Sequence, residues 1–307
     1  MGRRKKGEAI SGWVVVDKPL GPTSSDVVNR IRRAFNAQKA GHAGTLDPLA
    51  TGILPVALGE ATKTVPFMID ATKSYRFTMR FGTETTTDDA EGEVTVESPC
   101  RPTGVEIEAI LARFQGQIQQ VPPAFSAVKV DGERAYERAR AGEEVELAPR
   151  TVEIHEIALI SQPDAAHAEL EISCSKGTYV RSLARDIGRA LGAAAHVSAL
   201  RRTRHGPFTE KAAIPLDKLC ALGHIAPASG PMVHLLPLET ALDDIPALAV
   251  SGDDAARLRR GQGVLLRGRD APILSGSVLA THRGDPVALT EYRQGELRPV
   301  RVFNLAN

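Results

Sequence analysis

The sequence predicts an α+β fold, with a mixed, largely antiparallel sheet, flanking helices and a small β domain at the C-terminus. Residues 73–81 alternate between apolar and polar side chains, which indicates a strand with one buried face. Residues 179–191 instead carry apolar side chains at spacings of three and four, as an amphipathic helix does. Residues 247–307 hold only short apolar runs separated by Gly and Arg, a pattern typical of a small β-barrel.

The other elements near the N-terminus follow from the same reasoning. Three consecutive valines predict a short buried strand over residues 12–17. Thr23 and Asp26 have the spacing of a capping box, so a helix is expected over residues 25–35. Residues 40–60 contain four Gly and two Pro among small apolar residues, and we expect a long irregular segment there. Such segments are often functional, although a buried connection tied by glycines would have the same composition.

The middle of the chain alternates between strand and helix patterns. Residues 94–96 predict a strand that partners residues 73–81 across the acidic turn 85–92. Thr103 and Glu106 form a second capping box ahead of another amphipathic helix. Three further strands are expected over residues 152–160, 168–174 and 197–204. A protruding, partly helical insertion is expected over residues 121–150.

Composition excludes a mainly disordered chain and a polycation. The 307 residues include 42% apolar and 24% charged side chains, which is ordinary for a folded domain. The 38 basic and 37 acidic side chains nearly cancel, but the net charge is +5 over residues 1–63, −4 over residues 64–100 and +3 over residues 251–307. Such asymmetry is typical of a protein that contacts a polyanion at particular places, and a random surface imbalance would look the same.

The cysteines and the apolar runs bear on the cellular compartment. The three cysteines, Cys100, Cys174 and Cys220, form no C-x-x-C pair, which disfavours a disulfide framework and a structural zinc site. The apolar run at residues 13–16 is too short for a signal peptide. Residues 219–238 lack charged side chains but contain three Pro and two Gly, so they indicate a linker and not a membrane span. We therefore expect a cytoplasmic protein.

The search for standard catalytic motifs leaves one segment. The sequence lacks the phosphate loop, the dinucleotide fingerprint, the nucleophile elbow and the H-E-x-x-H zinc motif, so neither a cofactor nor a metal is expected. What remains is G-H-A-G-T-L-D-P-L-A-T-G at residues 41–52, where Asp47 lies on a Gly/Pro-shaped turn. Asp before Pro commonly opens a turn, but a partly buried carboxylate needs a partner, for which Arg181 is a candidate. From the residues alone, Asp47 is either a turn residue or a catalyst.

At this segment the chain resembles a known family. Residues 41–52, followed by G-E-A-T-K at residues 59–63, are similar to the catalytic loop of TruB-type tRNA pseudouridine synthases. Three other stretches agree in order: V-V-V-D-K-P-L-G-P-T-S at 14–24, K-S-Y-R-F at 73–77 and C-S-K-G-T-Y-V-R-S-L-A-R-D-I-G at 174–188. P-P-A-F-S-A-V-K-V-D-G-E-R-A-Y at 122–136 resembles the family's thumb insertion, and L-R-R-T at 200–203 resembles its last site motif.

The resemblance covers about residues 12–220 and sets the expected domains. A basic tail, expected to be disordered, occupies residues 1–11, a catalytic domain spans residues 12–246 with a thumb at about 121–150, and a PUA-like RNA-binding domain spans residues 247–307. Because the last domain carries none of the implied chemistry, we expect a chain ending near Pro246 to bind tRNA more weakly, and with a shallower salt dependence, yet still to isomerise it.

The resemblance implies that uridine is converted to pseudouridine at position 55 in the T loop of tRNA. The N1–C1′ bond breaks, the uracil rotates and C5 joins C1′, so no cofactor is needed. Asp47 matches the family's essential aspartate and would act as a nucleophile or as the base that forms a glycal. Arg181 would pair with Asp47, and Tyr75 would stack on the uracil and help to remove the C5 proton.

Four more residues are implied to serve the site. Tyr179 would line the nucleotide pocket, Leu200 would form its apolar wall, and Lys18 would support the catalytic loop. His42 would occupy the stack that the uridine leaves when it is flipped out of the RNA loop. These four residues, and Tyr75 as well, also have an ordinary structural interpretation. Leu200 and Tyr75 would be core residues, Tyr179 a helix-start aromatic, His42 a structural histidine and Lys18 part of a solvated turn.

Two other functions are compatible with these features. A non-catalytic RNA-binding or tRNA-folding protein would use the thumb, the PUA-like domain and the basic ends, but it would not need Asp47, Tyr75 and Arg181 together. A guide-RNA-dependent relative would need extra surfaces for partners, and this chain has no long charged extension. We therefore expect the T arm of tRNA as the partner, and no obligate protein partner.

Overall fold

The computed structural model describes residues 7–126, 128–130, 132–143, 145–223, 230–266 and 275–305. The chain folds around a ten-stranded sheet. The main path of that sheet runs in the order β14 (Ile214–Pro215), β1 (Gly12–Lys18), β3 (Ala50–Leu58), β12 (Ala195–His205), β4 (Lys73–Phe81), β11 (His167–Cys174), β10 (Arg150–Asp164) and β7 (Gly116–Gln120). Only the β1–β14 and β3–β12 pairs of this path are parallel, so the predicted mixed, largely antiparallel sheet is confirmed.

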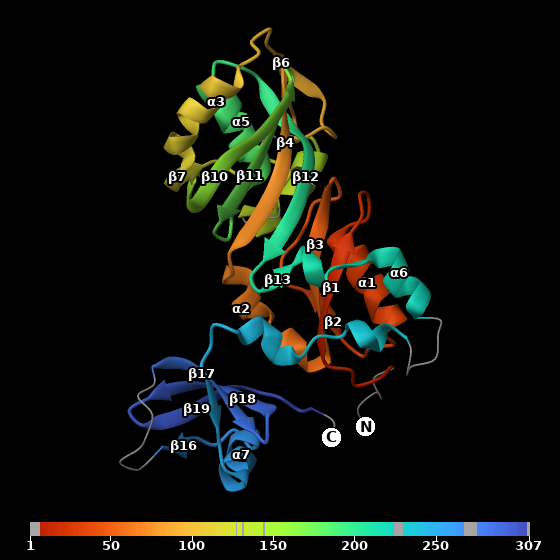
Figure 1. Cartoon of the computed structure of the whole chain (residues 1–307), viewed down its shortest axis with the longest axis vertical. Coiled ribbons are helices and arrows are strands. Elements are labelled where there is room, and N and C mark those ends of the chain that lie inside the picture. The colour runs from red at the N-terminus through yellow and green to blue at the C-terminus, as the bar shows by residue number, and fades with distance from the viewer. Residues whose placement is uncertain are drawn as a thin grey trace.

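Helices cover the two halves of this sheet (Figure 1). In one half, α3 (Gly104–Leu111) packs on β10, and α5 (Val180–Ala190) packs on β12 and β4. In the other half, α1 (Ser24–Ala34) packs against α6 (Leu216–Leu222) and against β2 (Ala40–His42) and β3. The long strands β4 and β12 run between the halves, and one apolar core extends through both. Both predicted capping boxes are present, at Thr23 and at Thr103.

Several shorter elements complete the catalytic region. They are β5 (Thr83–Thr85), β6 (Val94–Glu97), β8 (Lys129–Val130), β9 (Glu133–Arg134), β13 (Phe208–Thr209), α2 (Val65–Asp70), α4 (Ala135–Arg140) and 3-10 turns at Gly59–Lys63, Ala112–Phe114, Glu210–Ala212, Pro231–His234 and Leu238–Leu242. The predicted thumb is partly helical through α4. Its stem is fixed to α5, because the Ser182 hydroxyl donates to the Val121 carbonyl at 2.8 Å.

Three predictions are wrong in part. Most of residues 40–60 is regular, because β2 and β3 pair as an antiparallel hairpin, a 3-10 turn begins at Gly59 and only residues 43–49 are irregular. The pattern misled us because β3 is buried on both faces, so its side chains show no alternation. Strand β6 pairs with β5 and not with β4. Residues 7–11 were expected to be disordered, yet Glu8 forms a bridge with Ala37, while residues 1–6 lie outside the described residues.

The C-terminal region is a PUA-like domain, as predicted. Its five-stranded sheet runs in the order β15 (Ala247–Ala249), β17 (Gly276–His282), β18 (Asp285–Arg293), β19 (Glu296–Val302) and β16 (Val264–Leu265), and it packs against α7 (Gly252–Arg259). Leu279, Leu289 and Phe303 of this domain share one apolar cluster with Trp13 and Ile53 of the catalytic domain. Removing the domain after Pro246 would therefore expose a shared core, which argues against the expected activity of the shortened chain.

Candidate active site

The segment that carries Asp47 is an irregular loop, residues 43–49, between β2 and β3. Two buried side chains fix its backbone. The hydroxyl of Ser24 donates to the Leu46 carbonyl at 3.0 Å and accepts from the Leu46 N–H at 2.8 Å. The ammonium of Lys18 donates to the carbonyls of Pro48, at 3.2 Å, and Ala50, at 2.7 Å. Asp47 is therefore held from both sides by neighbours that α1 and β1 supply.

Asp47 forms an ion pair with Arg181, the second residue of α5. The Nε atom of Arg181 lies 2.9 Å from Oδ2 of Asp47, and the side chains are 6% and 38% exposed, respectively. A buried guanidinium thus orients a carboxylate that still reaches solvent. The directed N–H groups of the Arg181 guanidinium can hold the carboxylate in one orientation, as a nucleophile or a general base requires.

Arg181 itself is fixed by three groups that sequence reasoning missed. Its two terminal nitrogens donate to the carbonyls of Thr87 and Phe125, each at 3.0 Å. The buried carboxylate of Asp89 lies 3.5 Å from Nη1. The only signal for Asp89 was the acidic turn 85–92, which indicated a hairpin and not a partner for Arg181. The loop 86–93 and the thumb stem therefore meet at the same arginine.

Six of the seven residues singled out from the sequence line one cleft of about 850 Å³: His42, Asp47, Tyr75, Tyr179, Arg181 and Leu200. The sheet explains how they meet. Leu200 on β12 pairs in register with Ala50, the first residue of β3, and with Phe77 on β4. Residues 150 positions apart in sequence therefore form adjacent walls. Lys18 does not line this cleft; it lies fully buried beneath the loop, so it is not in a solvated turn.

Burial sets the protonation of the aromatic side chains around Asp47. It raises the pKa of the Tyr75 phenol, with a smaller opposing effect of the Arg202 guanidinium, and it raises the pKa of Tyr179. Both phenols are therefore neutral near pH 7. Burial, assisted by Arg202, lowers the pKa of His42, whose Nδ1 accepts a hydrogen bond from the Gly44 N–H at 3.3 Å. His42 thus presents a neutral ring to the cleft.

Burial also lowers the pKa of Lys18 to about 8, while the nearby Asp47 carboxylate acts in the opposite direction. The Lys18 ammonium donates to the carbonyl of Pro19, at 3.0 Å, as well as to the two loop carbonyls. Three acceptors match the three N–H donors of the charged form. The charged form is therefore the one that the loop geometry suits best.

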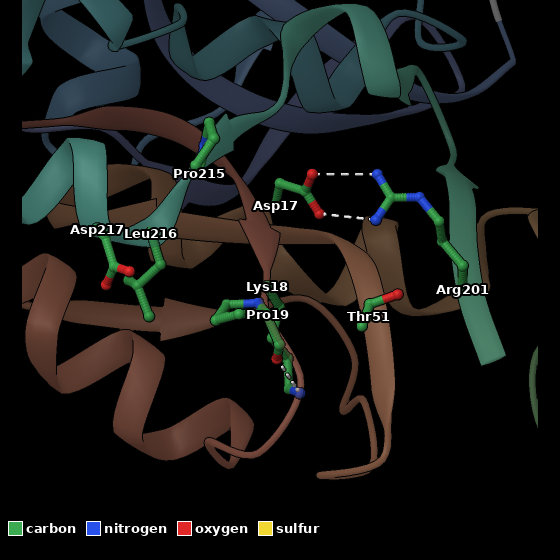
Figure 2. A pocket seen from close by; sticks show the side chains of 8 residues that line it. All are labelled: Asp17, Lys18, Pro19, Thr51, Arg201, Pro215, Leu216 and Asp217. Atoms are coloured by element: carbon green, nitrogen blue, oxygen red, sulfur yellow. Dashed lines mark hydrogen bonds and ion pairs between the residues drawn. The ribbon is translucent and has the colours of Figure 1, made fainter. Parts of the chain in front are cut away.

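A second, smaller depression of about 260 Å³ lies at the end of β1, where Asp17, Lys18 and Pro215 line it (Figure 2). Its main feature is the bidentate pair between Arg201 and Asp17, at 3.0 and 3.1 Å. Both side chains of that pair are about one-third exposed, and none of the six cleft residues lines it. The larger cleft, with its buried arginine and its convergent aromatic rings, is the better candidate for the chemistry.

No group of three or more His, Cys, Asp or Glu side chains within the described residues is arranged to hold a metal ion. No helix within the same residues is long and apolar enough to cross a membrane.

The fold is similar to that of solved structures over nearly the whole chain. A chain in "Structure of H/ACA RNP bound to a substrate RNA containing 2'-deoxyuridine" superposes with a TM-score of 0.74 at 25% identity, covering 99% of this chain and 92% of that one. A chain in "Crystal Structure of a Cbf5-Nop10-Gar1 Complex" gives a TM-score of 0.73 at 29% identity, covering 95% of this chain and 84% of that one. The first of these holds a substrate RNA.

Family models and curated relatives specify the class. The description "TruB family pseudouridylate synthase (N terminal domain)" matches residues 32–180, and "tRNA pseudouridylate synthase B C-terminal domain" matches residues 181–243. Together with the fold and the cleft, these matches define a pseudouridylate synthase, which is an isomerase. A tRNA pseudouridine synthase B of Bradyrhizobium diazoefficiens is 59% identical over 98% of this chain and 88% of its own length. One of Caulobacter vibrioides is 55% identical over 99% of this chain and its entire own length. The chain belongs to the TruB family.

Proposed function

We propose that this enzyme converts uridine 55 in the T loop of tRNA to pseudouridine, using Asp47 and no cofactor. The observation that carries the proposal is the Asp47–Arg181 ion pair at 2.9 Å, in a cleft whose lining includes three tyrosines and two leucines. Relatives that are 53–59% identical over nearly the full chain and are called tRNA pseudouridine synthase B support tRNA as the substrate.

The uridine must leave its RNA loop before it can reach Asp47. Flipping a base out costs a few kcal/mol, which a side chain can offset by stacking in the space that the base vacates. His42 suits this role because it is neutral, half-buried and placed on the strand that leads into the catalytic loop. The flipped uracil then lies against Leu200, with Tyr179 at the nucleotide backbone and the Tyr75 ring on the base.

The chemistry is an isomerisation that Asp47 starts and Arg181 orients. In one route, Asp47 attacks C1′ as the N1–C1′ bond breaks, and the Asp47–C1′ bond breaks in turn when C5 of the rotated uracil bonds to C1′. In the other route, Asp47 removes the C2′ proton as the N1–C1′ bond breaks, and it returns that proton to C2′ when C5 bonds to C1′. The C5 proton then leaves and N1 takes up a proton, so atoms balance without an added reagent. The raised pKa of Tyr75 makes its phenol a poor base near pH 7, which favours stacking over proton removal.

The thumb, the basic segments and the PUA-like domain are the surfaces that we assign to the T arm and the rest of the tRNA. The family's name supports tRNA as the partner. Beyond what the name says, we propose contact with the T arm, action without a protein partner and a cytoplasmic location. A protein that acts on free tRNA needs only phosphate contacts and one flipped base, both of which a single chain can supply.

The structural neighbours raise a rival function, since one of those structures is an RNP with a substrate RNA and the other is a complex of several proteins. Their identity to this chain is 25–29%, whereas the tRNA pseudouridine synthases B reach 59% and match the full length. The closer similarity favours action without a guide RNA. A non-catalytic RNA-binding function is disfavoured because it gives no reason to orient a half-exposed carboxylate with a buried arginine.

Tritium release tests the proposal directly. A T-arm hairpin with [5-³H]uridine at the target position is incubated with the full chain and no other RNA or protein. We expect release of the label from that position, and none from a hairpin labelled only at stem uridines. Absence of release from an enzyme that binds the hairpin would contradict the proposal, and release only upon addition of a guide RNA would favour the rival.

A further inference from the structure

Arg202 is a fully buried arginine beneath the catalytic loop, with 1% of its surface exposed. Its Nε atom donates to the Ile53 carbonyl at 2.7 Å. Its two terminal nitrogens donate to the carbonyls of Gly44, at 3.2 Å, and Thr45, at 3.4 Å. One guanidinium therefore joins the start of the loop that carries Asp47 to strand β3 on the other side of it.

Burying a cation whose partners are mainly backbone carbonyls costs free energy of folding. Within the described residues, Arg202 donates to three backbone carbonyls and also hydrogen-bonds the Tyr75 side chain, but it forms no ion pair with a carboxylate. Removing a charge from water without a counter-charge costs several kcal/mol, so a core position of this kind is normally apolar. Gly44 and Thr45 lie in the irregular loop, and Ile53 lies one residue past Gly52, where the pairing of β3 with β12 ends, so their carbonyls need other donors. The planar fork of an arginine reaches all three, which the single ammonium of a lysine does not.

The preceding residue shows what an ordinary arginine does on the same strand. Arg201 lies on the opposite face of β12, where it pairs with Asp17 (Figure 2). It also pairs with Glu210, at 2.6 Å. Its side chain is 36% exposed, and it contacts no residue of the catalytic loop in the bonds that the described residues make. The L-R-R-T motif therefore contains one outward arginine in solvated ion pairs and one inward arginine that holds the loop.

We propose that Arg202 is a positioning residue for the proposed isomerisation: it fixes the loop backbone so that Asp47 meets both Arg181 and the ribose of the flipped uridine. It does not touch the substrate. Without it, three carbonyls lose their donors and the loop relaxes, which moves Asp47 relative to Arg181. A displacement of about 1 Å at a reacting group lowers a rate by about 10²-fold, whereas RNA binding by distant surfaces is unchanged.

The test compares Arg202→Met, Arg202→Lys and the matched control Arg201→Met in the full chain. For each, we would measure the single-turnover rate of pseudouridine formation at saturating enzyme, the Kd for the T-arm RNA, the melting temperature and the hydrogen exchange of amides 43–53 without RNA. We expect Arg202→Met to lower the rate by about 100-fold or more, to keep Kd within about three-fold and to speed exchange in the loop. Arg201→Met keeps rate, Kd and loop exchange near wild type.

The Lys variant separates the bridging geometry from charge alone. We expect a folded protein with a rate at least about 10-fold below wild type, because one ammonium replaces three directed donors. A wild-type rate in Arg202→Lys, or in a folded Arg202→Met, would overturn the inference. If Arg202→Met does not fold, Arg202→Lys decides alone. Hydrogen exchange of the loop is measured without RNA, so it tests the role of Arg202 separately from the activity. If the wild-type enzyme made no pseudouridine, the proposed function would be refuted. Faster loop exchange in the Arg202 variants would still support the positioning role.

Discussion

Asp47 combines two properties that rarely occur together: it is fixed by a buried arginine, and more than a third of its side chain is exposed. Asp47→Asn keeps the shape of the side chain and removes its charge and its nucleophilic oxygen. We expect kcat to fall by at least about 10³-fold, or about 4 kcal/mol of barrier. The Kd for tRNA changes little, because the thumb, His42 and the basic segments still engage the RNA.

Side-by-side assays of pseudouridine formation and tRNA binding check this expectation. Asn is itself a good turn former, so near-normal turnover in the variant would mean that Asp47 only shapes the turn.

Tyr75 offers a second test at the scale of one residue. Its raised pKa predicts that the ring matters more than the hydroxyl. Tyr75→Phe keeps the ring, and we expect it to retain at least about 10-fold more activity than Tyr75→Leu, which removes the stacking surface. Rates at saturating RNA are the measurement. Equal losses in the two variants would assign the essential role to the hydroxyl.

At the scale of elements, the junction of β3 and β12 positions the site, and Gly52 makes that junction possible. Its φ is +95°, and a Cβ there would lie 2.3 Å from the Arg202 carbonyl oxygen. We expect Gly52→Ala to destabilise the protein by about 2 kcal/mol or more, and to impair turnover in the fraction that folds. Denaturant unfolding measures the loss.

Gly41→Ala is the matched control for Gly52→Ala. Gly41 lies on the neighbouring strand β2, and a Cβ there would meet no atom within 4 Å. It is expected to stay within about 0.5 kcal/mol of wild type. Equal stability of the two variants would contradict the tight junction.

The elements also explain which features the sequence could reveal. The alternation of residues 73–81 and the capping boxes are local patterns, and both predicted their elements correctly. Strand β3 was missed because a strand buried on both faces has no period. Asp89 lies in the predicted acidic turn and Arg202 in the L-R-R-T motif, but neither pattern shows the partners of these residues, Arg181 and the loop carbonyls, which lie far away in the chain. The motifs therefore located residues of the site, whereas the contacts of Asp89 and Arg202 depend on packing that the sequence pattern does not show.

At the scale of the whole molecule, the segment Gly59–Lys63 links the two domains. The ammonium of Lys63 donates to the Val302 carbonyl at 2.7 Å, and the Glu60 carboxylate accepts from the Asn304 N–H at 2.7 Å. Lys63→Met removes one charge-assisted bond of about 1.5–3 kcal/mol and loosens the PUA-like domain. We expect about three- to ten-fold weaker binding of full-length tRNA, with turnover of a T-arm hairpin within about three-fold of wild type.

Lys211→Met, which removes the same charge from an exposed turn, is the control for the domain junction. Kd values for both RNAs are the measurement. Equal weakening for tRNA and hairpin, or the same loss in the control, would mean that the loss reflects charge and not the position of the domain.

The placement of β12 between β3 and β4 also determines when the enzyme can first exist during its synthesis. β3 and β4 follow each other in the chain, yet the strand that joins them ends at His205. Until that strand has left the ribosome, the central part of the sheet has two open edges, and such edges readily pair with other chains. A nascent chain is therefore inactive and most prone to aggregation while about two-thirds of it is already made, and its completion depends on the slow formation of long-range strand pairs.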